Sequence, residues 1–310
     1  MNKTVQLNSL SEISEKRPTY LALGSFDGVH LGHQEVLHNM VTAAQADGAR
    51  TAVLTFFPHP KRVLQNVSEA YYITTLADRV RLLSEQGVDL VITHPFNDKV
   101  RHIRAADFVE QLIKYADMRQ IWGGNFAFGY KREGDIPFLR KLGAERGFSV
   151  QLVQAMVEVA GERVSSSRIR RCLQAGNIAE ANFCLGRPFH VSGAVVVGDQ
   201  RGRTIGFPTA NLAVWDELIL PANGVYATYV WVGTTRYAAA TNVGNRPTVN
   251  GRSVTVEAHL LDFDQDVYGQ ELRIEFISHI RPEKKFAGLE ALTAQIQRDV
   301  AEVRGLLQVS

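Results

Sequence analysis

The pattern of hydrophobic residues changes near residue 185, and this change constrains the fold more than any other feature of the chain. Between residues 19 and 157, short apolar runs alternate with stretches in which apolar residues recur every three or four positions. The runs at 20–23, 51–56, 88–92 and 120–122 are typical of buried strands, and 34–46 and 75–86 of helices. Because strands that alternate with helices form parallel sheets covered by helices, we expect an α/β domain.

After residue 189 the sequence is rich in β-branched residues. The runs at 191–197, 225–232, 236–242, 254–263 and 272–277 are divided by Gly, Asn, Asp and Pro, which is typical of an antiparallel barrel or sandwich. At the end of the chain, apolar residues recur in steps of three and four and predict one amphipathic helix that packs on the β-domain: Phe286, Leu289, Leu292, Ile296, Val300 and Val303. A short helical stretch at 166–184 precedes the change, so the predicted domains are residues 1–184 and 185–310.

Composition excludes several classes of protein. The chain of 310 residues has 34 basic and 32 acidic residues, a formal charge of +2, so we expect no broad surface for nucleic acid or an anionic membrane. Residues 1–16 lack the apolar stretch of a secretory signal, and no run of about 18 apolar residues could span a bilayer. These features predict a cytoplasmic protein. The two cysteines, Cys172 and Cys184, have no metal-site spacing and are assigned no chemistry.

The first motif with chemistry is GSFDGVHLGH at residues 24–33, between a predicted strand and a predicted helix. A helix N-terminus offers unpaired N–H groups and a positive dipole end to phosphates, and glycines allow the backbone to approach closely. His30 and His33, three residues apart, can point to one side and donate hydrogen bonds to a phosphate chain whose charge rises as a leaving group departs. The motif therefore predicts a phosphate site.

A second polar motif is VSSSRIR at residues 164–170. By itself it is explained by a helix N-cap at Ser165 or Ser166 followed by solvated arginines. A phosphate contact through Ser166, Ser167 and Arg168 is implied only by a family resemblance that the motif shares with the histidine motif.

The third motif lies at residues 197–212, where three glycines and two arginines precede a rigid Pro-Thr-Ala-Asn. Gly198, Gly202 and Gly206 can form a loop that covers phosphates. Pro208 fixes the backbone so that Thr209 and Asn211 present oxygens to a metal ion. The Walker spacing of glycines and lysine is not present, so the glycines alone are weak evidence for a nucleotide site.

At these residues the chain resembles a known family. The string at 24–34 resembles the adenylyltransferase half of bacterial bifunctional riboflavin kinase/FAD synthetases. The string GFPTAN at 206–211 resembles the riboflavin kinase signature and is followed in order by GVYA at 224–227, NVGNRPT at 242–248 and VEAHLLD at 256–262. The resemblance covers nearly the whole chain after residue 18. It implies a Rossmann-like nucleotidyltransferase domain with a parallel sheet, then a riboflavin kinase domain built on a six-stranded antiparallel barrel with a C-terminal helix.

The resemblance also implies the reactions. ATP would phosphorylate riboflavin to FMN with release of ADP, and ATP would adenylylate FMN to FAD with release of pyrophosphate. The resemblance implies Mg²⁺, with Thr209 and Asn211 as its ligands, Glu257 as the general base of the kinase, and His30, His33 and Arg168 as catalytic residues of the adenylyltransferase. The implied binding residues are Gly24, Phe26, Asp27, Gly32, Asn125, Ser166 and Ser167 in the first half, and Gly198, Gly202, Arg203, Gly206, Pro208 and Asn242 in the second.

Some readings stay open. Residues 55–60 and 123–129 are implied to line the flavin and adenine pockets, but Phe56, Phe126 and Phe128 would equally serve as core aromatics, and Phe57 stands where the family commonly has a polar residue. The charged runs between residues 264 and 286 are most simply solvated strand edges and loops. Two alternatives remain: a chain that retains one of the two activities, and a flavin-binding regulatory module without turnover. The oligomeric state is not predicted.

Overall fold

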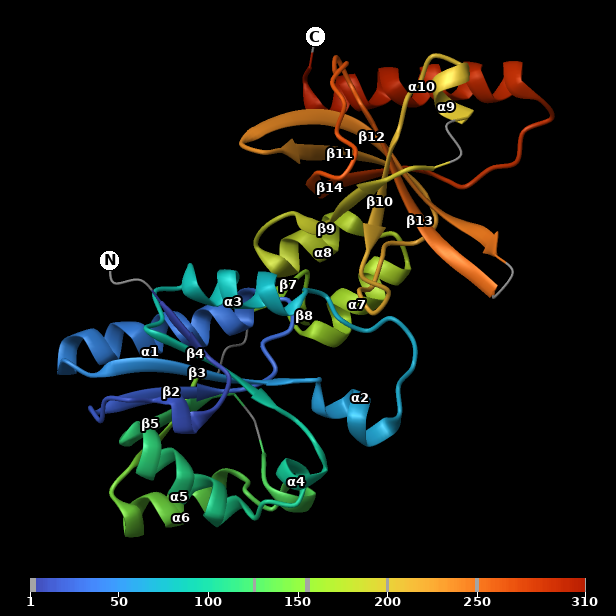
Figure 1. Ribbon diagram of the computed structural model, residues 1–310. Coiled ribbons are helices and arrows are strands. Elements are labelled where there is room, and N and C mark those ends of the chain that lie inside the picture. Colours follow the sequence, from blue (N-terminus) through green and yellow to red (C-terminus); the bar gives the residue numbers. More distant parts are fainter. Residues whose placement is uncertain (1–3, 125–126, 154–156, 199–200, 249–250, 310) are drawn as a thin grey trace. The chain divides into compact units, whose positions relative to one another are not determined.

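The computed structural model describes residues 4–124, 127–153, 157–198, 201–248 and 251–309, and it leaves the side chains of 201 and 246–253 undescribed. The chain forms two compact units, which are treated separately. One comprises Met1–Glu69 and Thr74–Ser165, and the other comprises Ala70–Ile73 and Ser166–Ser310. Figure 1 shows the elements of both units.

The first unit is built on a six-stranded parallel sheet with the order β1-β4-β3-β2-β5-β6. Its strands are β1 (Val5–Leu7), β2 (Thr19–Leu23), β3 (Arg50–Phe57), β4 (Leu90–Pro95), β5 (Met118–Gly123) and β6 (Ser149–Leu152). The central strand β2 is buried at every residue, as expected of a parallel strand covered on both faces. The predicted α/β domain with a parallel sheet is confirmed.

Helices cover both faces of this sheet (Figure 1). On one face, α1 (Leu31–Asp47) and α3 (Leu76–Ser84) bury residues such as Leu37, Met40 and Leu83 against the strands. On the other face, α5 (Ala105–Ala116) and α6 (Ile136–Arg146) bury Phe108, Leu112 and others. The short helices α2 (Pro60–Gln65) and α4 (Asp98–Arg101) follow β3 and β4. A small antiparallel ribbon, β7 (Glu158–Val159) and β8 (Glu162–Arg163), closes the unit.

The second unit contains a closed barrel with the order β10-β13-β12-β11-β14-β9. Its strands are β9 (Phe189–Val196), β10 (Ala210–Val214), β11 (Gly224–Val232), β12 (Thr235–Thr248), β13 (Gly251–Leu260) and β14 (Glu271–Pro282). All neighbours are antiparallel, and β9 pairs with both β10 and β14, which closes the barrel. A barrel rather than a sandwich is therefore the outcome. The sequence pattern does not reveal β10, because its first residues belong to the motif at 197–212, which is expected to form a loop.

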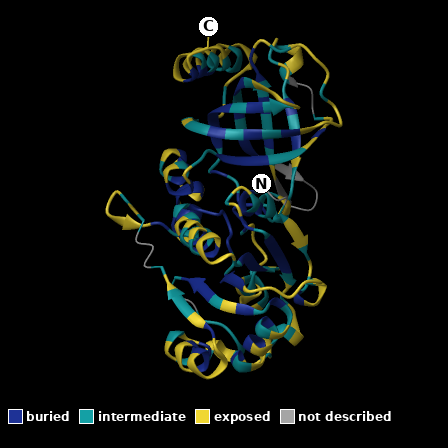
Figure 2. Ribbon diagram, turned by 90° about the vertical axis from the view of Figure 1, so that its left-hand side faces the viewer, coloured by how far each residue is buried: buried dark blue, intermediate teal, exposed yellow. Residues whose placement is uncertain are grey.

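The C-terminal helix α10 (Leu289–Leu307) packs on the outside of the barrel, as predicted. Val303 and Leu307 contact Ala227 and Ala238 in one apolar cluster. Much of the helix surface remains exposed, whereas the barrel strands are mostly buried or intermediate (Figure 2). The helix is also fixed by charge, since the Arg281 guanidinium of β14 donates hydrogen bonds of 2.7–3.1 Å to both carboxylate oxygens of Asp299.

Two helices, α7 (Ser166–Gln174) and α8 (Ile178–Leu185), and the segment Ala70–Ile73 belong to the barrel unit. Tyr72 pairs with Leu218 in a β-bridge, and its ring stacks on Trp215 with centroids 5.0 Å apart. Packing thus divides the chain after residue 165. The predicted boundary after residue 184 concerns functional domains and stays a prediction.

Replacing Asp299 with Ala removes the carboxylate that holds Arg281. We expect the free energy of unfolding of the barrel unit to fall by about 3 kcal/mol, because a mostly buried guanidinium loses its charged partner. Urea denaturation followed by circular dichroism measures the change. The control is Glu302→Ala at an exposed position of the same helix, expected to shift stability by less than about 0.5 kcal/mol. Equal effects of the two changes would show that the ion pair does not stabilise the unit.

Candidate active sites

The histidine motif forms the loop between β2 and α1. The Gly24 N–H donates a hydrogen bond to the Leu54 carbonyl at 3.1 Å, and the Thr55 hydroxyl donates to the Ser25 carbonyl at 2.8 Å. Both bonds attach the start of the loop to β3. These bonds therefore fix the direction in which the loop leaves the carboxyl edge of the sheet. This is the edge where α/β proteins bind ligands.

His30 is the N-cap of α1. Its Nδ1 accepts the His33 N–H at 3.3 Å, so the neutral ring carries its proton on Nε2 and keeps that atom as a donor. The two imidazoles stack with centroids 3.7 Å apart. A side chain at Gly32 would lie 3.3 Å from the His30 ring, so glycine leaves room for this arrangement. The predicted pairing of the two histidines at a helix N-terminus is present.

Phe26 and Asp27 are buried within the same loop. The Phe26 side chain is 4% exposed and packs in the core beneath α1. The Asp27 carboxylate accepts hydrogen bonds from the Thr74 N–H and hydroxyl and forms an ion pair with Arg79, each at 3.2 Å. Gly28 donates its N–H to the same Thr74 hydroxyl at 3.2 Å. These contacts brace the loop from below, so a nucleotide contact at Phe26 or Asp27 would come from the backbone.

The second phosphate motif forms the first turn of α7. Arg168 is 3% exposed, and its Nε and one terminal nitrogen lie 2.8 and 2.7 Å from a carboxylate oxygen of Glu180 on α8. Glu180 is oriented by Asn177, whose amide donates to its other oxygen at 2.7 Å. The hydrogen bond from Arg168 holds the pKa of Glu180 below its usual value. A phosphate at Arg168 would thus share the guanidinium with a carboxylate.

Arg170, two residues further on, was not singled out by the sequence. Its Nε donates to the Tyr71 carbonyl at 2.7 Å, and its guanidinium lies 3.8 Å above the Tyr71 ring. The only sequence signal was the repeated arginine of the motif. Nearby, burial raises the pKa of the Cys172 thiol to about 11, so this cysteine stays a neutral thiol, in line with the absence of assigned chemistry.

The predicted kinase residues lie side by side on the barrel. Asn211 of β10 is opposite Glu257 of β13, and Glu257 is opposite Asn242 of β12. Directly opposed residues share one face of a sheet. The intervening residues, such as Ala258 and Val256, are at most 1% exposed and point into the barrel, so the three polar side chains lie on its outer face. Two candidate roles, metal ligand and base, are therefore brought together by strand register.

The glycines of the third motif clear space around these residues. A Cβ at Gly198 would lie 2.5 Å from the side-chain amide of Asn211, and one at Gly202 would lie 2.2 Å from the Phe207 carbonyl oxygen. The Phe207 N–H closes the loop by donating to the Gly202 carbonyl at 2.8 Å. Gly206 has φ +86°, a value that glycine adopts readily. Local geometry thus explains why glycine stands at each of these three positions.

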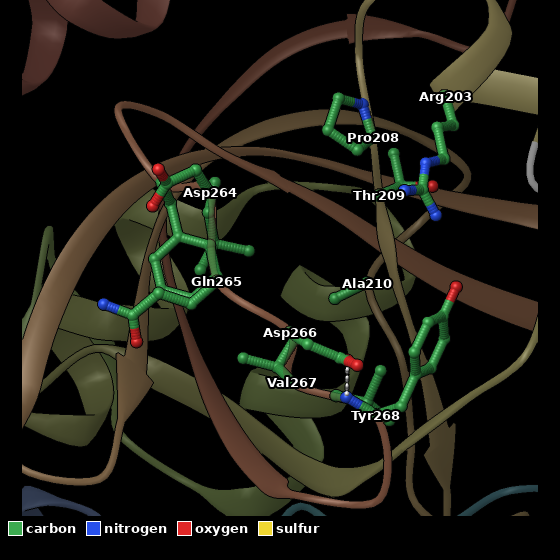
Figure 3. A pocket seen from close by; sticks show the side chains of 12 residues that line it. Arg203, Pro208, Thr209, Ala210, Asp264, Gln265, Asp266, Val267 and Tyr268 are labelled. Atoms are coloured by element: carbon green, nitrogen blue, oxygen red, sulfur yellow. Dashed lines mark hydrogen bonds between the residues drawn. The ribbon is translucent and has the colours of Figure 1, made fainter.

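A pocket of about 440 Å³ adjoins this loop (Figure 3). Arg203, Pro208, Thr209 and Ala210 line one side, and residues 263–268 line another, with Asp266 accepting the Tyr268 N–H at 2.9 Å. The charged runs between residues 264 and 286 are expected in solvated strand edges and loops, so the sequence does not indicate that residues 263–268 line this pocket. No periodic signal marks such a loop, because only folding brings it to Thr209.

The aromatic motifs of the first unit are partly described. Phe56 and Phe128 pack on the core cluster, and each ring contacts Phe108. Phe57 is half-buried and precedes a cis proline peptide. Asn125 and Phe126 lie outside the described residues. The core alternative thus accounts for Phe56 and Phe128, while their predicted contact with flavin or adenine stays a prediction.

Comparisons with known proteins agree with this geometry. A family model described as riboflavin kinase matches residues 185–307, and one described as FAD synthetase matches residues 12–168. The bifunctional riboflavin kinase/FMN adenylyltransferase of Listeria monocytogenes is 37% identical over 92% of this chain and 91% of its own length. The Escherichia coli K12 protein of the same name is 38% identical over 92% and 91%.

One solved structure is similar along the whole length. A crystal structure described as a macrolide-efflux protein from Streptococcus pneumoniae has a TM-score of 0.90 and 32% sequence identity, covering 98% of this chain and 99% of that one. Among the residues described for the present chain, there is no helix with the length and apolar character needed to cross a membrane.

The two domains define an enzyme that transfers phosphorus-containing groups, with a kinase fold and a nucleotidyltransferase fold on one chain. The chain belongs to the family of bifunctional riboflavin kinase/FMN adenylyltransferases. It is thus a bifunctional enzyme of flavin cofactor synthesis, with a domain for each of the steps from riboflavin to FMN and from FMN to FAD.

Gly198→Ala should displace the amide of Asn211, because the new methyl group would occupy its place. We expect riboflavin phosphorylation to fall about tenfold or more, the effect of roughly one lost hydrogen bond or ligand contact. Adenylylation of FMN should not change. Gly305→Ala, at a helix position with nothing within 4 Å, is the control. Product analysis by chromatography measures both reactions, and undiminished FMN formation by Gly198→Ala would contradict the packing argument.

Proposed function

We propose that Glu257, Thr209 and Asn211 carry the kinase step, that His30 and His33 carry the adenylyl transfer, and that Ser166, Ser167 and Arg168 bind phosphate as the family motif implies. The observation that supports this assignment most is the row Asn211, Glu257, Asn242 across three strands of the barrel. The metal ligand must lie near the phosphates of ATP, and the base must lie within hydrogen-bond reach of the attacking hydroxyl. Strand pairing keeps the spacing between these two residues fixed.

In the kinase step, Glu257 accepts the proton of the terminal ribityl hydroxyl as this oxygen attacks the γ-phosphorus of ATP, the bond from that phosphorus to the bridging oxygen breaks, and ADP leaves. A hydroxyl and an amide oxygen, from Thr209 and Asn211, suit Mg²⁺, which prefers oxygen ligands and takes others from substrate phosphates. Within the described residues, there is no group of three or more His, Cys, Asp or Glu that could hold a metal ion. Bound Mg²⁺ would neutralise phosphate charge.

The pocket beside Thr209 is the proposed nucleotide site. Arg203 lines it and brings a positive charge for phosphates, while Phe263 and Val267 offer apolar surface for a base. Gly198, Gly202 and Gly206 let the covering loop approach closely, and Pro208 stiffens its end. Asn242, two strands away from Asn211, would contact riboflavin.

In the adenylyl transfer, a phosphate oxygen of FMN attacks the α-phosphorus of ATP, and pyrophosphate leaves. The His30 Nε2–H, His33 and the N–H groups at the start of α1 would donate to the phosphate chain as its charge increases. Gly24 and Gly32 keep this surface open, and Asp27 holds the loop in place from inside. Asn125 is proposed from the family motif alone.

On α7, the family motif supports Ser166 and Ser167 as donors to a phosphate. Arg168 remains the predicted phosphate ligand. Its ion pair with Glu180 also joins α7 to α8. Arg170 lies two residues further along the same motif, where it donates to the Tyr71 carbonyl and lies over the Tyr71 ring, so we add it as a candidate phosphate ligand. We also propose that residues 1–184 form the FMN adenylyltransferase domain and residues 185–310 the riboflavin kinase domain. The enzyme is proposed to be cytoplasmic.

The assignment of Glu257 is tested by Glu257→Gln, which keeps shape and removes the base. We expect kcat for riboflavin phosphorylation to fall by a factor of about 10²–10⁴, the usual contribution of general base catalysis. FMN adenylylation by the same sample serves as the internal control. Chromatography of reactions started with riboflavin or with FMN, each with ATP and Mg²⁺ or with EDTA, reports both steps. FMN formation at the wild-type rate would exclude Glu257 as the base.

The roles of the two arginines are separated by Arg168→Ala and Arg170→Ala. If Arg170 is the main phosphate ligand, its loss raises KM for ATP in FMN adenylylation about tenfold or more, since a charge-assisted bond is lost. Arg168→Ala would then act mainly by lowering the unfolding temperature, because Glu180 loses its partner. The reverse result, a larger KM effect from Arg168→Ala at unchanged stability, would restore Arg168 as the ligand.

A further inference from the structure

His259 lies two residues after Glu257 on β13 and therefore on the same outer face of the barrel. Its Nδ1 is 2.8 Å from the carbonyl oxygen of Pro208. Because a carbonyl can only accept, Nδ1 carries the proton and His259 is the donor. The bond crosses from β13 to the residue just before Thr209.

The ring of His259 also packs on Phe207 in an edge-to-face contact, with centroids 5.3 Å apart and planes at 77°. Phe207 closes the glycine loop through its bond to Gly202. The Thr209 methyl group lies 3.7 Å from where a Gly202 side chain would be. One imidazole thus contacts two successive residues between the glycine loop and Thr209.

We propose that His259 is a positioning residue for the kinase step, fixing through Pro208 and Phe207 the segment that presents Thr209 to the metal and phosphates of ATP. The inference rests on the proposed function of Thr209. The sequence indicates why such a support is needed: proline donates no backbone hydrogen bond, so this turn lacks one link to the neighbouring strand. A side chain from β13 supplies a link through the carbonyl instead.

Three replacements separate the hydrogen bond from the ring packing. His259→Phe keeps a ring against Phe207 and loses the donor. His259→Asn keeps an amide N–H near the place of Nδ1, and His259→Gln moves the amide toward the place of Nε2. For His259→Phe we expect KM for Mg-ATP and the Mg²⁺ concentration of half-maximal rate to rise about tenfold, one hydrogen bond's worth of binding. KM for riboflavin should stay within about twofold of the wild-type value, because the lost hydrogen bond supports the binding of Mg-ATP and not of riboflavin.

The measurements use the full chain, with FMN adenylylation and the unfolding temperature recorded on each sample. Recovery of KM for Mg-ATP by His259→Asn but not by His259→Gln supports the proposal. It is overturned if His259→Phe has the wild-type KM for Mg-ATP, or if His259→Asn is as impaired as His259→Phe at equal unfolding temperature. If the wild-type chain makes no FMN from riboflavin, the proposed function itself fails. If Thr209→Ala leaves Mg²⁺ dependence unchanged, the metal assignment fails while the riboflavin kinase activity stands.

Discussion

Closure of the barrel is the constraint on which the proposed kinase site depends. Strand β10 pairs with β9 on one side and β13 on the other, and without it the barrel would have two open edges. The same pairing sets Asn211 opposite Glu257. A shift of one residue would turn Ala210 and Leu212 outward and Asn211 into the core, at a large cost in burial and desolvation. The apolar core therefore enforces the register that places the polar residues outside.

The proposed adenylyltransferase site depends on a different set of interactions. Its loop carries two stacked imidazoles at the N-terminus of α1, and a buried ion pair holds it from inside. Removing one member of such a pair is costly, since it leaves a charge in a region without water. The loop is thus rigid at its base while its N–H groups remain directed at the carboxyl edge of the sheet. The apolar core of the barrel and the Asp27–Arg79 ion pair of the first unit thus fix where the proposed reactive groups lie.

The sequence singles out residues of contiguous motifs more readily than residues that only folding brings beside them. His30, Gly32, Asn211 and Glu257 belong to contiguous motifs, so their type and spacing could be read directly. The loop at residues 263–268 could not be recognised, because nothing local indicates that it lines a pocket beside Thr209. Glu180 was missed for the same reason: its pairing with Arg168 arises only when α7 and α8 pack together.

By itself, the sequence determined the two fold classes, the change in hydrophobic pattern near residue 185 and the motifs for which phosphate contacts are proposed, because periodicity and glycine spacing are local properties of the chain. The hydrophobic pattern left a barrel and a sandwich open, and the family resemblance implied the barrel that the structure shows. The tertiary structure decided the alignment of Asn211, Glu257 and Asn242 and the burial of Asp27 and Arg168. These outcomes depend on pairing between residues far apart in the chain. Hydrogen-bond closure and core packing fix that pairing, and no short segment contains it.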